Sequence, residues 1–248
     1  MRNISKYEDE YLSTDFEQKY QVYYRRKKVL EILREVSHKR ILEIGCGMQS
    51  IGAFVEDFEE FTIVEPGERF ADKAINDLQD KEGVRIVKGF LEESIEVLKE
   101  RTYDLIICSS LLHEVEEPIG MLQAIKHLCN KNTMVHINVP NEFSIHRILA
   151  YESGLIESIN SKSQRNILLQ QNSVFNLKNL EETICKTGKI SIYSKGSFFI
   201  KPFTHEQMEQ CLERGIIDEK ILEGFYRLTE YLPEYGSEIF INYQYMES

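Results

Sequence analysis

A short apolar run, Ile41–Ile44, followed at once by Gly45 and Gly47, constrains the fold of this chain more than any other feature. Runs of this kind form buried parallel strands, and the two glycines let the backbone turn tightly and approach a ligand closely. A second apolar run, Phe61–Val64, ends at Glu65, which stands 20 residues after Gly45. In a strand–loop–helix–strand unit this spacing places a carboxylate beside the ribose of a bound nucleoside. The sequence therefore predicts a nucleoside-cofactor site.

Between residues 39 and 139 the chain alternates apolar runs with helical stretches, which is typical of a doubly wound parallel sheet of α/β class. The expected strands are Ile41–Ile44, Phe61–Val64, Val84–Val87, Tyr103–Cys108 and Thr133–Val139. The expected helices are Ile51–Asp57, Arg69–Asp80, Leu91–Glu100 and Ile119–Cys129. Pro118 suits the first turn of the last of these helices.

The two ends of the chain predict accessory segments around this core. Residues 8–36 have an amphipathic helical pattern. After Pro140 we expect helices at Leu177–Lys186, Thr204–Arg214 and Asp218–Tyr231, and strands at Lys189–Tyr193 and Glu238–Tyr245. A length of 248 residues suits one α/β domain. We expect a single domain over 1–248, with a helical N-terminal cap at 1–36, a cofactor-binding core at 39–139 and substrate-side insertions at 140–175 and 200–235.

Composition excludes several classes of function. A formal net charge of −11 disfavours a nucleic-acid partner, and the only dense basic cluster, Arg25–Lys28, has the pattern of a solvated helix face. The 5 cysteines lack paired spacing, so we expect neither a disulfide framework nor a metal site, and reduced thiols fit a cytoplasmic protein. The sequence also has no signal-peptide core and no apolar stretch long enough to span a bilayer.

The details of the glycine loop select among nucleoside cofactors. A dinucleotide fingerprint requires a third glycine at the position of Ser50, so a nicotinamide dehydrogenase is disfavoured. The segment Glu43–Gly47 instead resembles motif I of the class I S-adenosylmethionine (SAM) methyltransferases, E/D-x-G-x-G-x-G. Gln49 stands where that motif has its third glycine, which is a departure from the pattern. The resemblance implies a Rossmann-like, seven-stranded, mostly parallel sheet, with a late strand inserted antiparallel beside the fifth.

A second match follows the expected fourth strand. The segment Tyr103–Pro118 resembles motif IV of small-molecule methyltransferases. Ser109 and Ser110 end the strand, where they are placed to hold the methionine end of SAM. His113 follows one short turn later and is the first candidate for a general base, because imidazole titrates near neutral pH. Glu114 is a further candidate, while the competing interpretation makes His113 a helix-capping or packing residue.

The remaining cofactor contacts come from the turn after the third strand. The resemblance assigns the adenine to Phe90, Leu91 and Glu92, although Phe90 replaces the usual aspartate and the segment also reads as a plain helix-capping turn. The full set of cofactor residues that we expect is Glu43, Gly45, Cys46, Gly47, Glu65, Pro66, Phe90, Leu91, Glu92, Ser109 and Ser110.

The fifth strand runs into Val139-Pro-Asn141, and His146 and Arg147 follow a few residues later. This segment, Gly196–Pro202 and Tyr235–Phe240 resemble a methyltransferase branch found in bacterial surface-polysaccharide and related biosynthesis. The resemblance places Asn141, His146 and Arg147 beside the acceptor, with His146 as a second candidate base and Arg147 suited to an anionic or hydroxyl-rich substrate. The alternative is that Arg147 is a surface residue and His146 a packing residue.

The leading hypothesis is a SAM-dependent methyltransferase that methylates an oxygen or nitrogen of a small molecule, with a sugar or lipid-linked sugar as one candidate acceptor and S-adenosylhomocysteine (SAH) as product. One alternative is a protein or RNA methyltransferase, but the D/N-P-P-Y/F motif of enzymes that methylate base amines is absent at Cys108–Leu111. Another is a non-catalytic module that binds SAM or SAH, to which the departures at Gln49 and Phe90 point. The sequence gives no indication of oligomeric state.

Overall fold

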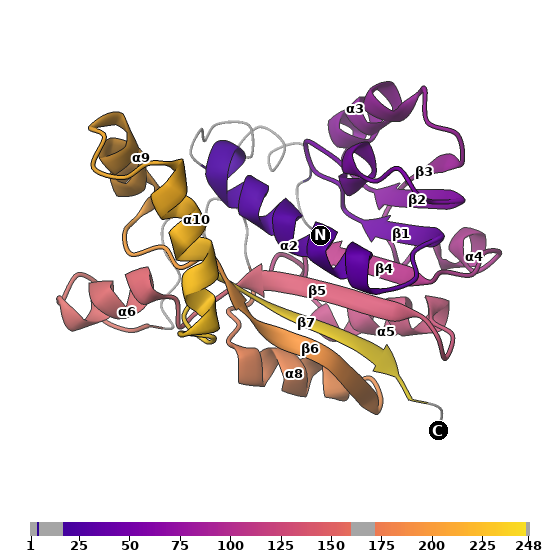
Figure 1. Ribbon diagram of the computed structural model, residues 1–248. Coiled ribbons are helices and arrows are strands. Elements are labelled where there is room, and N and C mark those ends of the chain that lie inside the picture. The colour runs from indigo at the N-terminus through magenta and orange to yellow at the C-terminus, as the bar shows by residue number, and fades with distance from the viewer. Residues whose placement is uncertain (1–3, 5–16, 160–171, 247–248) are drawn as a thin grey trace.

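The computed structural model describes residue 4 and residues 17–159 and 172–246, and it has the expected α/β architecture around one sheet (Figure 1). The seven strands lie in the order β3-β2-β1-β4-β5-β7-β6. Their bounds are β1 Arg40–Ile44, β2 Glu60–Glu65, β3 Val84–Lys88, β4 Leu105–Ser109, β5 Met134–Pro140, β6 Ile190–Phe198 and β7 Glu238–Tyr245. Strands β1 to β5 are parallel, and β7 is antiparallel to both of its neighbours. This topology confirms the predicted sheet, including the late antiparallel strand beside the fifth.

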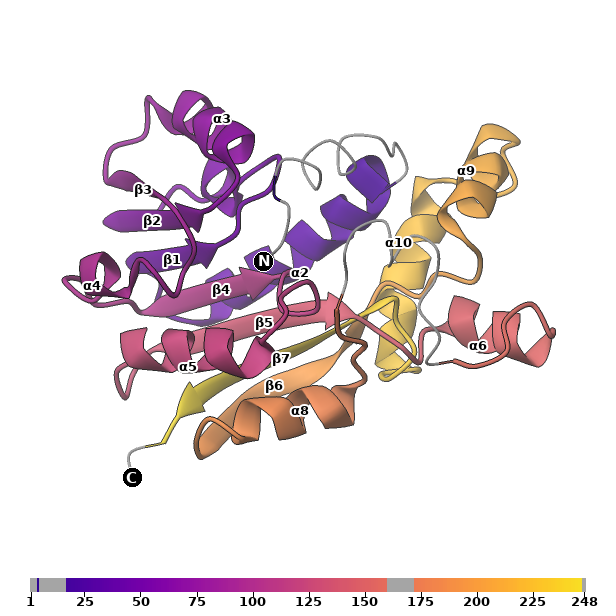
Figure 2. The same ribbon diagram turned by 180° about the vertical axis from the view of Figure 1, so that it is seen from behind.

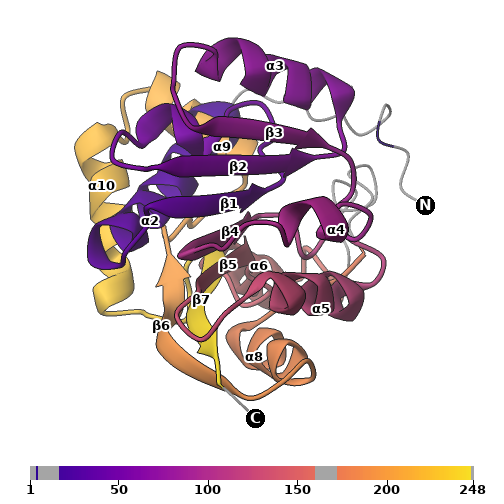
Figure 3. The same cartoon turned by 90° about the vertical axis from the view of Figure 1, so that its right-hand side faces the viewer.

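Helices cover both faces of the sheet, as the view along its edge shows (Figure 3). The described helical segments are η1 Glu17–Gln21, α2 Val22–Glu35, η2 Ile51–Phe54, α3 Glu68–Leu78, α4 Ile95–Leu98, α5 Pro118–Leu128, α6 Ile145–Glu152, α8 Leu177–Cys185, α9 His205–Glu213, α10 Glu219–Arg227 and η3 Leu228–Glu230. None of the helices in these described ranges is long and apolar enough to cross a membrane.

The alternation of side chains along each strand builds two cores, one on each face of the sheet. Ile41 packs with Val29 of α2 and Phe70 of α3 on one face. Leu42, the next residue, packs with Leu122 of α5 on the other face, where α4, α5 and α8 lie (Figure 2). Both faces are therefore buried, which explains why apolar residues occupy consecutive positions in the central strands.

Two predicted helices are much shorter than expected. Ile51–Asp57 contains only the 3₁₀ turn η2, because Lys81 Nζ donates to the carbonyl oxygens of Gly52 at 3.0 Å and Val55 at 2.8 Å, so these oxygens are bound from outside the segment. Leu91–Glu100 contains only α4, whose Leu98 carbonyl accepts from Tyr103 Oη at 3.0 Å. In contrast, the strand expected at Lys189–Tyr193 extends to Phe198 as β6.

The first turns of α2 are anchored over the sheet by a buried polar network. Glu238, at the start of β7, is 2% exposed and receives Arg25 Nη2 on Oε1 at 2.7 Å. Gln21 Nε2 donates to the same oxygen at 2.9 Å, and Asn138 Nδ2 of β5 donates to Oε2 at 2.7 Å. Because a buried carboxylate with this many donors fixes its partners firmly, the network holds the N-terminal end of α2 above the carboxyl ends of the strands. Of the helix expected over residues 8–36, residues 8–16 lie outside the described ranges.

Candidate cofactor and active site

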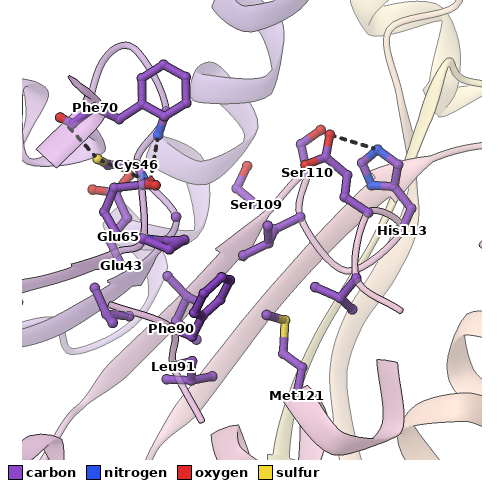
Figure 4. A pocket seen from close by; sticks show the side chains of 18 of the residues that line it. Glu43, Cys46, Glu65, Phe70, Phe90, Leu91, Ser109, Ser110, His113 and Met121 are labelled. Carbon is purple, nitrogen blue, oxygen red and sulfur yellow. Dashed lines mark hydrogen bonds and ion pairs between the residues drawn. The ribbon is translucent and has the colours of Figure 1, made fainter. Parts of the chain in front are cut away.

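A cavity of about 870 Å³ lies where the loops after β1, β2, β3 and β4 meet the first turns of α2. This is the carboxyl edge of the parallel strands, where open α/β sheets bind ligands. Figure 4 shows Glu43, Cys46 and Glu65 on one side of the cavity, Ser110 and His113 on the other, and Phe90, Leu91 and Met121 between them. Every residue that the sequence assigns to the cofactor lines this cavity, as do His113 and Glu114.

The glycine loop after β1 needs its two glycines for conformational reasons. Gly45 has φ 73° and Gly47 has φ 53°, values that side-chain-bearing residues seldom adopt. A Cβ atom on Gly45 would also lie 3.0 Å from Leu111 Cδ2. Gln49 is not among the described residues with positive φ, so its backbone does not require glycine. Its side-chain Oε1 accepts from Arg26 Nη2 of α2 at 2.7 Å.

Glu65 fastens the glycine loop to the end of β2. Its Oε2 accepts from Cys46 N at 2.9 Å, and its Oε1 accepts from Gly67 N at 2.7 Å. The residue is 5% exposed, and burial raises the pKa of its carboxyl group against the lowering effect of these amide donors. Because each carboxylate oxygen accepts more than one hydrogen bond, Glu65 keeps capacity toward the cavity, where a ribose hydroxyl would donate.

Glu43 performs a similar task at the other end of the loop. Its Oε2 accepts a short hydrogen bond from Ser50 Oγ, and its Oε1 accepts from Ile51 N at 3.0 Å. Burial raises the pKa of Glu43 to about 7. Ser50, which replaces the dinucleotide glycine, therefore has a defined role in this loop, because its hydroxyl holds Glu43.

The loop after β4 carries the candidate base. Ser110 has φ 54°, a strained value for serine, and its N donates to Asn138 O at 2.8 Å. His113 is 3% exposed, and its Nε2 lies 3.7 Å from Oε1 of Glu114, which is 5% exposed. Asn172 N donates to His113 O at 2.9 Å, so the chain at Asn172 braces this loop.

The three residues that the sequence places beside the acceptor do not line the cavity. Asn141 Nδ2 donates to the carbonyl oxygens of Glu234 and Gly236, both at 2.8 Å, which ties the end of β5 to the segment before β7. Arg147 Nε donates to Ile159 O at 3.2 Å. Burial, with nearby Lys201 and Arg147, lowers the pKa of His146 to about 2. The cavity lining therefore does not support the assignment of these three side chains to the acceptor.

The sequence predicts a helical N-terminal cap, but it did not identify which residues of α2 would form a wall of the cavity. Val22, Arg25, Arg26 and Val29 line the cavity. The basic cluster in this helix was expected to be a solvated face, but Arg25 and Arg26 line the cavity instead. The only signal in the sequence was the density of the cluster itself. Among the residues that the structure describes, no group of three or more His, Cys, Asp or Glu side chains is arranged to hold a metal ion.

Comparison with known proteins agrees with the fold and the cavity. Residues 16–195 match a family described as "Methyltransferase domain". No curated protein matches the sequence.

Three solved structures illustrate the similarity of fold. The plantazolicin methyltransferase BamL, in complex with a triazolic desmethylPZN analog and SAH, is 13% identical with a TM-score of 0.61, covering 94% of this chain and 88% of that chain. The N-methyltransferase NodS from Bradyrhizobium japonicum WM9, in complex with SAH, is 10% identical with a TM-score of 0.55. The match covers 95% of this chain and 90% of that chain. A SAM-dependent methyltransferase from Archaeoglobus fulgidus is 16% identical with a TM-score of 0.54. The match covers 92% of this chain and 97% of that chain.

The fold, the carboxylates at the ends of β1 and β2, and the family match over residues 16–195 agree with one another. The chain belongs to the methyltransferase-domain family, as a class I methyltransferase whose cofactor is SAM.

Proposed function

We propose that this methyltransferase acts on an oxygen or nitrogen of a small molecule, which binds in the same cavity as SAM. The observation that carries the proposal is that one cavity reaches from Glu65 to His113 and Glu114. Its volume of about 870 Å³ is near the upper end of the range of roughly 300–1,000 Å³ for small-molecule pockets. This size supports a small acceptor beside the cofactor.

We propose that the parts of SAM lie against different loops of the cavity, in the order of the strands. Phe90 and Leu91 follow β3 and would cover the adenine, and Glu65 at the end of β2 would accept from the ribose hydroxyls. The loop after β1 and Ser109 at the end of β4 would then hold the methionine part. SAM bound in this way supplies a methyl group already activated by its sulfonium.

In this arrangement His113 would act as the general base. The acceptor loses a proton when it is methylated, and a neutral imidazole beside the cavity is suited to take it. Glu114 Oε1, 3.7 Å from His113 Nε2, would stabilise the imidazolium that forms. Both side chains are buried, which favours exclusion of water from the reacting atoms. His146 is not retained as a second base, because its pKa is lowered to about 2 and it does not line the cavity.

The acceptor class and the domain organisation are part of the same proposal. A formal charge of −11 argues against nucleic acid, and a sugar or lipid-linked sugar is the first class to test. We also propose a single domain, in which residues 1–36 cap the core at 39–139 and residues 140–175 and 200–235 surround the acceptor side.

The experiment is a methyl-transfer assay with SAM and a panel of sugars, lipid-linked sugars, amines, proteins and RNA, read by mass spectrometry. The proposal requires a product heavier by one methyl group among the small molecules. Methylation of protein or RNA alone would overturn it. For the active acceptor, His113→Ala should lower turnover by about 10²- to 10⁴-fold while SAH affinity changes little.

His127→Ala is the matched control, because His127 is exposed on α5 and does not line the cavity. Its turnover should equal that of the unsubstituted protein. If His113→Ala also turns over normally, His113 is not the base.

A further inference from the structure

Three of the four basic residues at 25–28, in the first half of α2, form ion pairs with carboxylates. Arg25 pairs with Glu238, Lys27 with Glu223 and Lys28 with Glu31. Arg26 has no carboxylate partner among the residues that the structure describes. Its Nη2 donates to the neutral Gln49 at 2.7 Å, and its guanidinium carbon lies 3.8 Å from the ring centre of Phe54.

Arg26 is also partly buried and lines the cavity, which the exposed Gln49 lines as well. Burial lowers the pKa of its guanidinium, because the charge is removed from part of its water, and no described carboxylate pairs with it. A guanidinium has five N–H donors in a planar fork that matches a carboxylate. The contacts to Gln49 and Phe54 fix its direction, but neither of them supplies a negative charge.

The loop that Gln49 belongs to follows β1, beside β4 in the sheet. With the nucleoside over β3 and β2, this is the end of the cavity where the amino-acid part of the cofactor would lie, so the inference rests on the proposed placement of SAM. That part carries a carboxylate.

We propose that Arg26 binds the carboxylate of the cofactor, and that Gln49, in place of the third motif glycine, is a positioning residue that holds Arg26 there. This role would account for Gln49 at the position where the motif has its third glycine. The loop loses a glycine that its backbone does not need and gains an acceptor that directs a cation of α2 into the site.

The test compares two ligands by calorimetry. SAH contains the carboxylate, whereas 5′-methylthioadenosine has the same nucleoside and thioether but no amino-acid part. Arg26→Ala should weaken SAH binding by about 10- to 100-fold, the loss expected for a charge-assisted hydrogen-bond pair. Binding of 5′-methylthioadenosine should stay unchanged. Gln49→Ala should weaken SAH less, by about 3- to 10-fold, because Arg26 remains but is less well directed.

Gln49→Glu separates recognition of a carboxylate from a merely structural tether between α2 and the loop. A glutamate keeps the contact to Arg26 but neutralises it, so we expect SAH to bind about as weakly as it does to Arg26→Ala. If the contact were only a tether, Gln49→Glu would bind SAH normally. Arg34→Ala is the matched control, since Arg34 lies in the last turn of the same helix, is exposed and does not line the cavity.

The outcomes are distinguishable from failure of the proposed function. If the unsubstituted protein binds neither ligand, the placement of SAM itself is wrong. If it binds both and Arg26→Ala binds SAH equally well, the role of Arg26 is overturned while the cofactor site stands. Equal losses for SAH and 5′-methylthioadenosine would also overturn it, because the substitution would then have damaged the cavity as a whole.

Discussion

At the scale of single residues, two buried carboxylates determine the shape of the cofactor loop. Glu65 receives the amide of Cys46 at the beginning of the loop, and Glu43 receives the hydroxyl of Ser50 and the amide of Ile51 at its end. Only Glu65 was expected to act through its charge. The pKa of Glu43 is raised to about 7 by burial, so Glu43 can remain protonated near neutral pH.

This raised pKa has a consequence for the dependence of stability on pH. The ordinary carboxyl value is 4.5, so between about pH 4.5 and 7 the folded protein retains a proton that the unfolded chain has released. Stability therefore falls as the pH rises through this window and levels off above it, by up to about 3 kcal/mol from this group. Glu43→Gln cannot ionise, so its stability should lack this fall. The free energy of unfolding of the variant minus that of the unsubstituted protein should therefore be larger at pH 8 than at pH 5. The measurement is chemical denaturation of both proteins at the two pH values, and a constant difference would contradict the assignment.

Glu65 should affect cofactor binding more than stability. In Glu65→Ala the ribose loses a charged acceptor and the loop amide of Cys46 loses its partner, so SAH affinity should fall by about 10- to 100-fold. Calorimetry measures the change. Glu60→Ala is the control, since Glu60 begins the same strand at its far end and pairs with Arg101 away from the cavity. Unchanged SAH affinity in Glu65→Ala would remove this residue from the site.

The residues that sequence alone could identify are those whose roles depend on neighbours close in the chain. Gly45 and Gly47 have the positive φ values that their motif requires, and Glu65 lies at the strand end that its spacing predicts. The partner of Gln49 is Arg26, which is 23 residues away and on another element, so no local pattern pointed to it. For Asn141 a local pattern was misleading. Its position resembles a motif for acceptor binding, but its side chain donates hydrogen bonds to the carbonyl oxygens of Glu234 and Gly236.

At the scale of elements, strands were predictable because both faces of the sheet are buried. A continuous apolar run such as that of β4, which is buried from Leu105 to Cys108, is typical of a strand covered on both faces. Helix ends were less predictable. The segment after Ser50 has a helical pattern, yet Lys81 binds its carbonyl oxygens from a distant turn and limits the helix to η2.

The start of β7 depends on a close approach between two backbones. A Cβ atom on Gly236 would lie 2.5 Å from the carbonyl oxygen of Phe198, the last residue of β6, and no flexible side chain can yield there. Gly236→Ala should therefore destabilise the protein by more than about 1 kcal/mol. Gly224→Ala is the matched comparison, because Gly224 is exposed within α10 and has no atom within 4 Å of the new Cβ position.

For Gly224→Ala we expect the free energy of unfolding to increase by about 1 kcal/mol, which is the difference in helix propensity between glycine and alanine. Thermal or denaturant unfolding of the two variants measures both effects. Equal changes in the two variants would mean that the approach of β6 to the segment before β7 is not tight.

At the scale of the whole molecule, α2 connects the cofactor loop to the C-terminal helices. One of its tyrosines, Tyr24, stacks on Phe199 at 4.3 Å between ring centres and on Tyr226 of α10 at 5.3 Å. These contacts join residues about 175 to 200 positions apart, and the sequence showed only scattered aromatic residues in both regions. Fold class was predictable from the core, whereas this arrangement of accessory helices depends on long-range packing that has no local signature.

Ligand binding should be visible as stabilisation of the whole chain. A ligand at about 100 times its dissociation constant adds about 2.7 kcal/mol to the free energy of unfolding. For a chain of this size that corresponds to a rise in melting temperature of about 5 to 10 °C. SAM and SAH should produce this shift, while NAD and NADP should not, because Ser50 occupies the position of the dinucleotide glycine and its hydroxyl is bonded to Glu43. A thermal-shift series with the four ligands measures the difference, with Glu65→Ala as the variant in which the SAH shift should shrink. A comparable shift with NAD would mean that the loop accepts a dinucleotide after all, since only binding to the folded state raises the melting temperature in this way.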